Sequence, residues 1–222
     1  MTTRILGAPV TIGLTRDDVV REVADAVINL SAEIRVDSFV ISGGASTPAV
    51  LRLVARRWRA GHTPSIIVSD ERHCDDMTEH NAEQLRAALA NTALVSAPII
   101  APPSSSDLIS AAREWSRRLE QIATPSLAIM SMADDGHIAS LFPSVEVTTV
   151  SGSVVVCHAS PKPPPQRVSL SSTYLRGIEH RFAVVIGAEK SAVLSSVAKG
   201  ADLPVALLKP TRWFVESSAN LG

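Results

Sequence analysis

The sequence predicts an α/β fold, with a doubly wound, mostly parallel sheet and helices on both faces. Short runs of β-branched and aliphatic residues alternate along the chain with stretches of helical period, which is typical of this class. The strand-like runs are apolar at successive positions, as expected for strands that are buried on both faces. The length of 222 residues and the 45% hydrophobic content suit one sizeable core, so we expect a single domain over residues 1–222.

The first half of the chain holds clear local signals. Pro9 and Gly13 interrupt an apolar stretch that we interpret as a first strand and turn. Thr15 then opens a capping box with Asp18, and the apolar residues that follow recur at helical spacing as far as Leu30. The next elements are expected, in order, as a strand at 36–42, a helix that begins at Thr47 and carries Trp58, a strand at 65–69, a helix at 79–90 and a strand at 94–101.

The second half continues the alternation. Residues 108–122 give the clearest amphipathic helix, and 127–132 is a fully apolar strand. The proline-dense loop at 160–165 is expected to be a rigid surface loop rather than a hinge. The other elements are expected as a strand-rich stretch at 145–157, strands at 167–170 and 182–186, a helix at 189–198, and strands near Val205 and Phe214.

Composition excludes several classes of function. The 21 basic and 22 acidic side chains give a net charge of −1, which excludes a generally basic nucleic-acid binder. Cys74 and Cys157 are too few for a disulfide framework or a four-ligand zinc site. No apolar stretch approaches the ~18 residues of a membrane span, and the N-terminus does not resemble a signal peptide. We therefore expect a cytoplasmic protein with no nucleic-acid or membrane partner, either a monomer or a small homo-oligomer.

Polar clusters follow several predicted strands, at the edge where parallel sheets bind their ligands. In the first cluster, Ser42, Gly43 and Gly44 lead through Thr47 into a helix. The glycines let the backbone approach a ligand closely, the hydroxyls can donate, and a helix N-terminus attracts an anion. The alternative is a tight turn with a Ser/Thr cap. Neither GxGxxG nor GK[ST] is present, so NAD and ATP are disfavoured.

The second cluster closes the strand at 65–69. Arg72 could grip a phosphate or carboxylate, with Asp70 holding it or binding a sugar hydroxyl, although charged residues at a strand end are often simply solvated. The following segment, 73–80, contains histidines, a cysteine and acidic residues. Its spacing lacks the regularity of known metal motifs, so we expect no metal and interpret it as a polar loop that enters a helix.

The third cluster ends the strand at 127–132 and contains Asp135 and His137. A histidine with an ordinary pKa of about 6.5 suits proton transfer at neutral pH, here with a carboxylate beside it. The alternative is an Asp-Gly turn with an incidental histidine. Further on, Arg167 and Lys190 begin separate segments. Two cations that converge would suit a phosphate, whereas each alone is an ordinary surface residue.

Taken in this order, the clusters resemble the motifs of the 6-phosphogluconolactonase family, within the larger group that includes glucosamine-6-phosphate deaminase. The segment 132–143, Met-Ala-Asp-Asp-Gly-His-Ile-Ala-Ser-Leu-Phe-Pro, is nearly the whole of the family's most specific motif. The likeness extends from about residue 36 to the end of the chain. The other segments similar to family motifs are 42–48, 70–72 with Asn81, 167–171, 187–190, 203–204 and 213–214.

The resemblance implies a modified Rossmann fold and a reaction. The family hydrolyses 6-phospho-D-glucono-1,5-lactone to 6-phospho-D-gluconate in the oxidative pentose phosphate pathway, without a metal or organic cofactor. The resemblance implies that His137 is the general base for water attack on the lactone carbonyl and that Asp135 orients His137. The residues that it implies for binding the sugar phosphate are Ser42, Gly43, Gly44, Thr47, Asp70, Arg72, Arg167 and Lys190.

Two rival functions are weighed against this reading. Deaminases of the group continue after the histidine with Phe-Asn-Glu, whose glutamate assists ring opening. Here the segment Ser140 to Pro143 follows and carries no acid, which favours the lactonase. A non-catalytic sugar-phosphate-binding protein is the second rival, and the intact Asp135-Gly136-His137 sequence argues against it.

Overall fold

A mostly parallel sheet of eight strands forms the centre of the computed structural model, which describes residues 3–104 and 107–219. The strand order is β1-β2-β12-β11-β7-β3-β4-β6, and every neighbouring pair is parallel except β1 and β2. These strands are β1 Arg4–Ile5, β2 Ala8–Gly13, β3 Ser38–Ile41, β4 Ser65–Val68, β6 Ile99–Ile100, β7 Leu127–Ser131, β11 His180–Val185 and β12 Arg212–Glu216.

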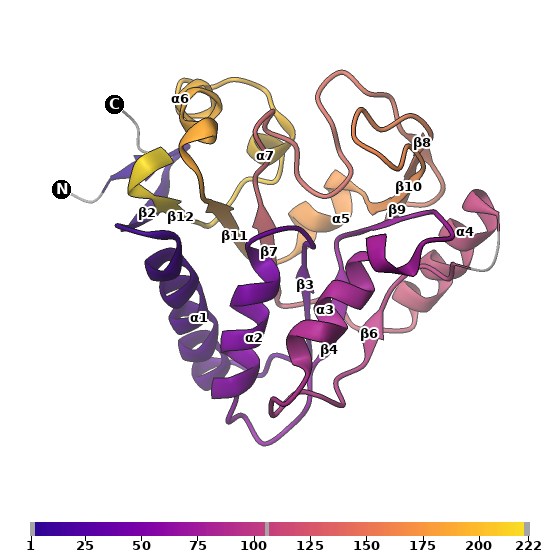
Figure 1. Ribbon diagram of the computed structural model, residues 1–222, viewed down its shortest axis with the longest axis horizontal. Helices are drawn as coiled ribbons and strands as arrows, with labels where there is room; N and C mark the ends of the chain where they lie inside the picture. The colour runs from indigo at the N-terminus through magenta and orange to yellow at the C-terminus, as the bar shows by residue number, and fades with distance from the viewer. Residues whose placement is uncertain (1–2, 105–106, 220–222) are drawn as a thin grey trace.

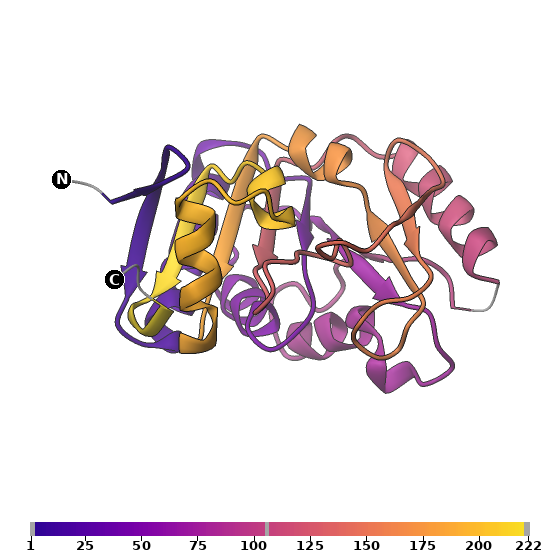
Figure 2. The same ribbon diagram turned by 90° about the horizontal axis from the view of Figure 1, so that it is seen from above.

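Helices cover both faces of this sheet, which confirms the predicted fold class. Figure 1 shows α1, α2 and α3 on one side of the sheet and α6 and α7 on the other, and Figure 2 shows α6 lying across β11 and β12. The helices are α1 Arg16–Glu33, α2 Thr47–Arg57, α3 Asn81–Leu89, α4 Leu108–Glu120, α5 Ser172–Gly177, α6 Ser191–Ala198 and α7 Pro204–Leu207. None of the helices in the described ranges is long and apolar enough to cross a membrane.

A second, antiparallel sheet lies beside the first, and the sequence did not predict it. Its strand order is β5-β10-β9-β8, and α4 packs against β9 and β10. Its first strand is the charged segment after β4, so Asp70 and Glu71 are buried in a sheet and not solvated at a strand end. Its strands are β5 Asp70–Arg72, β8 Thr148–Thr149, β9 Val154–Cys157 and β10 Arg167–Leu170.

Three further expectations need correction. The strand predicted near Val205 is wrong, because Pro204 begins the short helix α7 there. Of the strand predicted at 94–101, only the two residues of β6 are extended, after a series of turns. The helix predicted from residue 79 begins at Asn81, after a separate 3₁₀ turn at Met77–Glu79.

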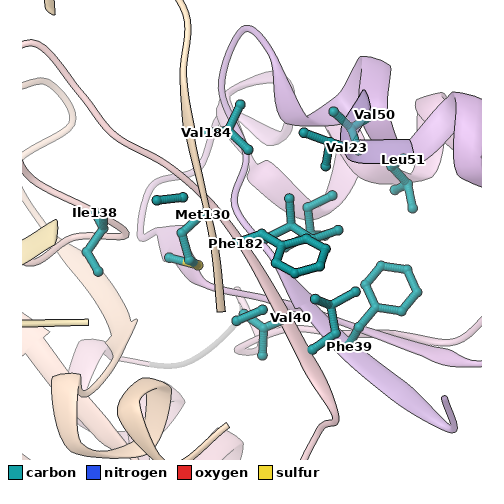
Figure 3. Packing of buried hydrophobic residues seen from close by; sticks show 14 of the residues in the cluster. Val23, Phe39, Val40, Val50, Leu51, Met130, Ile138, Phe182 and Val184 are labelled. Carbon is teal, nitrogen blue, oxygen red and sulfur yellow. The ribbon is translucent and has the colours of Figure 1, made fainter. Parts of the chain in front are cut away.

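Apolar side chains of the central strands pack against the helices that cover the sheet. Thr15 caps α1 through the predicted capping box with Asp18, and the helix lays its apolar stripe on the sheet. Figure 3 shows Phe39 and Val40 of β3 beside Phe182 of β11, near the helical side chains of α1 and α2. Each such buried side chain stabilises the fold by about 1.5–3 kcal/mol.

The strand order places a crevice between β3 and β7. The chain leaves β3 toward β4 on one side, whereas it leaves β7 toward β11 on the other. In doubly wound sheets, ligands bind outside the carboxyl ends of the strands at such a switch point. Hydrogen bonds join the two strand ends, from the Ser42 N–H to the Ile129 carbonyl (3.1 Å) and from the Ser131 N–H to Ser42 Oγ (3.0 Å).

Candidate active site

A cavity of about 510 Å³ opens at this switch point and extends to the second sheet. All the site residues that the sequence predicts line it, except Thr47 and Asp135. The cavity residues that the sequence did not assign to the site include Asn81, Asp134, Phe142, Lys162 and Glu189.

The loop after β3 forms one wall, and its neighbours fix its shape. A Cβ on Gly43 would overlap Asn81 Oδ1, and Gly44 has a φ of +92°, so both positions require glycine. The Thr47 hydroxyl donates to the carbonyls of Ser42 (2.6 Å) and Gly43 (2.8 Å) and is fully buried. Thr47 therefore lies behind the loop and holds it, while the loop itself lines the cavity.

The acidic residues of β5 are held by partners far away in sequence. Asp70 accepts hydrogen bonds from the hydroxyls of Ser69 (2.6 Å) and Ser140 (2.6 Å), which ties β5 to the loop after His137. Glu71 accepts from the backbone N–H groups of Arg72, Asn81 and Ala82 at 2.7–2.8 Å and so caps α3. Burial raises the pKa of Glu71, against the effect of these N–H groups.

Arg72 lines the cavity and has one donor without a partner in the described part of the chain. Its Nη1 contacts the carbonyl of Glu79, but its buried Nε has no partner among the described residues. Asn81, which also lines the cavity, has a buried and unpartnered Oδ1 while its Nδ2 donates to the Asp70 carbonyl (2.9 Å). A buried polar atom without a partner costs about 1–3 kcal/mol, so these two atoms reduce the stability of this wall.

His137 is held by Asp135 through two hydrogen bonds. Asp135 Oδ1 accepts from His137 Nδ1 (2.6 Å) and from the His137 backbone N–H (3.0 Å). A proton on Nδ1 leaves a lone pair on Nε2, and Asp135 lies outside the cavity that His137 lines. Burial lowers the pKa of His137, and the Asp135 carboxylate opposes this.

The turn before His137 depends on Gly136. This glycine has a φ of +84°, and a Cβ there would lie 2.8 Å from Leu203 Cδ1. Its carbonyl accepts from the Val205 N–H (3.2 Å), which explains why the predicted C-terminal motif at 203–204 lies beside the histidine loop. The Phe142 ring packs on the imidazole, with 4.3 Å between the centroids.

The basic residues gather from four separate segments. Arg72, Lys162, Arg167 and Lys190 all line the cavity, together with the acidic residues Asp70, Asp134 and Glu189. Lys162 Nζ lies 2.6 Å from Asp134 Oδ1. Burial lowers the pKa of Lys190, and the nearby Glu189 opposes this. Burial likewise lowers the pKa of Arg167, with Asp70 opposing it.

The described residues contain no group of three or more His, Cys, Asp or Glu side chains arranged to hold a metal ion. In the segment 73–80, His80 Nε2 lies 3.0 Å from the Cys74 carbonyl, and Asp76 caps the following turn through the Thr78 N–H. These side chains organise their own loop, as the sequence interpretation expects.

Comparison with known proteins identifies a family and relatives for this chain. The profile of the family described as glucosamine-6-phosphate isomerases/6-phosphogluconolactonase matches residues 14–216. The 6-phosphogluconolactonase of Mycobacterium leprae is 30% identical over 206 residues, which are 81% of this chain and 82% of that protein.

Two solved structures share the fold at low sequence identity. A 6-phosphogluconolactonase from Shewanella baltica aligns with a TM-score of 0.83 at 18% identity, covering 97% of this chain and 100% of that one. A monomeric glucosamine-6-phosphate deaminase aligns with a TM-score of 0.76 at 12% identity, covering 95% and 98% of the two chains. The fold alone therefore does not separate the two activities.

Proposed function

Because the chain belongs to the glucosamine-6-phosphate isomerase/6-phosphogluconolactonase family, we propose that it hydrolyses 6-phospho-D-glucono-1,5-lactone to 6-phospho-D-gluconate. The observation that carries the proposal is a histidine, oriented by a carboxylate, in a cavity that four basic side chains line. The cytoplasmic location and the single domain over residues 1–222 stay predictions.

His137 acts as the general base in this proposal. Its Nε2 takes a proton from a water molecule as that water attacks the lactone carbonyl, and the imidazolium then protonates the departing ring oxygen. Asp135 holds the Nδ1 proton and stabilises the imidazolium that forms. The two proton transfers balance, so the enzyme returns to its starting state after each turnover.

The cations hold the anionic end of the substrate. Arg72 and Lys190 both line the cavity, and Lys190 lies near the carboxylates of Glu189 and Asp134 and near the ammonium of Lys162. The loop at Ser42–Gly44 lets the backbone approach closely. This binding positions the lactone carbonyl at His137, and such positioning lowers the barrier of the chemical step.

The loop after the histidine favours lactone hydrolysis over deamination. The hydroxyl of Ser140 is committed to Asp70, and Phe142 packs on the His137 ring. This loop carries no acid at the position where the deaminases have their glutamate. The carboxylate nearest to the imidazole is Asp135, which is already engaged with Nδ1.

The test is lactone hydrolysis by the purified protein, with the lactone generated in place and the spontaneous rate subtracted. A parallel assay measures deamination of glucosamine 6-phosphate. Acceleration of hydrolysis alone is the expected result. Deamination alone would replace the proposal with the deaminase, and silence in both with 6-phosphogluconate still bound would make the chain a binding protein.

A further inference from the structure

The loop between β9 and β10 lacks the donors that ordinary backbone provides. This loop, Ser160–Pro165, is here named the proline strap, and it contains three consecutive prolines at 163–165. Proline has no N–H, so the strap cannot fix itself through backbone donors at these positions. The Ser160 N–H donates to the Pro165 carbonyl (2.8 Å) within the strap, and the carbonyls of Lys162, Pro163 and Pro164 depend on side-chain donors.

Arg167 supplies these donors. Its Nε donates to the Pro164 carbonyl (2.8 Å), and its Nη2 donates to the carbonyls of Pro163 (2.9 Å) and Lys162 (3.1 Å). The residue is only 5% exposed, and its backbone is paired with β5 on one side and β9 on the other. The guanidinium therefore connects a rigid sheet to three successive carbonyls of the strap.

The strap carries Lys162 to the rim of the cavity. The Lys162 side chain is 46% exposed, lines the cavity and has its ammonium on Asp134. Ser160 is a second anchor, because its Oγ donates to the Lys162 carbonyl (2.8 Å) and accepts from the Lys162 N–H (3.2 Å). A long lysine side chain on an unanchored loop would lose more conformational entropy on binding a ligand.

The two arginines of the cavity are engaged differently. Arg72 has a buried Nε without a partner, whereas two of the three Arg167 nitrogens already donate to carbonyls. An anion that took these nitrogens would release the strap. Two of the Arg167 nitrogens are therefore committed to the strap, which gives this residue a task other than direct contact with an anion through them.

We infer that Arg167 is a positioning residue, which clamps the proline strap so that Lys162 presents its ammonium to the anionic ligand. Lys162 is then the ligand contact of the strap, and it exchanges Asp134 for the ligand. The inference rests on the proposed function for the identity of that ligand. It assigns to Arg167 a role other than the phosphate contact that the sequence predicts.

A double-mutant cycle tests this inference, with 6-phosphogluconate as the probe and its affinity measured by calorimetry. Lys162→Gln removes one charge-assisted hydrogen bond and is expected to weaken binding roughly tenfold. Arg167→Gln is expected to weaken binding by a similar factor, but to add little when Lys162 is already glutamine. Two independent contacts would instead multiply to about a hundredfold loss, and that result would overturn the inference.

Two readouts separate positioning from a general loss of structure. In Arg167→Gln, amide hydrogen exchange is expected to accelerate at Ser160 and Lys162, while Lys162→Gln leaves the Ser160 amide unchanged. Arg167→Lys keeps a donor for the carbonyls and is expected to recover part of the affinity. The matched control is Arg72→Gln, whose effect is expected to multiply with that of Lys162→Gln.

A second variant covers the case in which Arg167→Gln does not fold. Ser160→Ala removes the other anchor of the strap and is expected to weaken binding several-fold only while Lys162 is present. An equal loss in both backgrounds, or no loss in either, would contradict the inference. Wild-type hydrolysis is measured separately, so coupled binding without hydrolysis would refute the proposed function and leave the role of Arg167 standing.

Discussion

Replacing Asp135 by asparagine isolates the hydrogen bond that orients the general base. The variant keeps the shape of the side chain but removes the charge 2.6 Å from His137 Nδ1. The asparagine amide can also donate to Nδ1, which would favour a proton on Nε2 and remove the lone pair that accepts the water proton. We therefore expect kcat to fall while the affinity for 6-phosphogluconate stays within a factor of about two.

The expected fall in kcat depends on how exposed the side chains of Asp135 and His137 are. A hydrogen bond to a charged group contributes about 1.5–3 kcal/mol. The Asp135 side chain is 37% exposed and that of His137 is 15% exposed, so solvent screening puts the effect near the lower end of this range. About 1.5 kcal/mol corresponds to a loss of roughly tenfold in kcat.

The pH dependence of kcat is expected to change together with the fall in kcat of Asp135→Asn. Burial holds the pKa of His137 below its ordinary value of 6.5, and Asp135 raises it. Without the carboxylate the pKa falls further, so the acid limb of kcat against pH moves to lower pH although the rate drops. The control is Asp37→Asn, because Asp37 forms an exposed pair with Arg35 before β3. A wild-type kcat in Asp135→Asn, or an acid limb that moves to higher pH, would refute the reasoning.

Three further substitutions test the walls of the cavity. Thr47→Val removes two buried hydrogen bonds to the glycine loop, so we expect about 1–3 kcal/mol less stability in urea unfolding and weaker 6-phosphogluconate binding. Gly43→Ala forces a Cβ against Asn81, and calorimetry should show the loss of 6-phosphogluconate binding in a folded protein. Burial raises the pKa of Glu71 above 4.5, so the folded state binds more protons at this site than the unfolded state. The contribution of Glu71 to stability should therefore fall as pH rises from about 4.5 through the raised pKa. Urea unfolding at a series of pH values should show this decline in the wild type and not in Glu71→Gln.

The switch-point site was predictable because its signals are local. The apolar runs that became β3 and β7 both end in polar residues, and parallel strands bring such ends to one edge. Gly43 and His137 therefore line the same cavity, as the sequence reasoning expects of strand ends. The capping box at Thr15 is equally local and is present in the structure.

The second sheet was not predictable in the same way. Asp70 and Glu71 become buried only because Ser140 and the N-terminus of α3 satisfy their carboxylates. No periodic pattern in the sequence predicts contacts with partners so far away in the chain. The same holds for Lys162, which looks like a surface lysine in a proline-rich loop until Arg167 fixes that loop at the cavity.

Short apolar segments misled the strand assignment. The residues near Val205 are apolar, but a stretch of four residues shows no period that separates helix from strand. Pro204 starts a helical turn there, and the Val205 N–H donates to the carbonyl of Gly136. The local signal of Pro204 and the contact with the histidine turn together favour the helical conformation of this segment.

The most direct test of the account compares lactone hydrolysis by the wild type and by His137→Gln. The matched control is His158→Gln, because His158 is exposed, lies outside the cavity and contacts Thr148. General base catalysis predicts a loss of about 10²–10⁴ in kcat for His137→Gln alone, with 6-phosphogluconate still bound. Hydrolysis by His137→Gln at the wild-type rate would contradict the account.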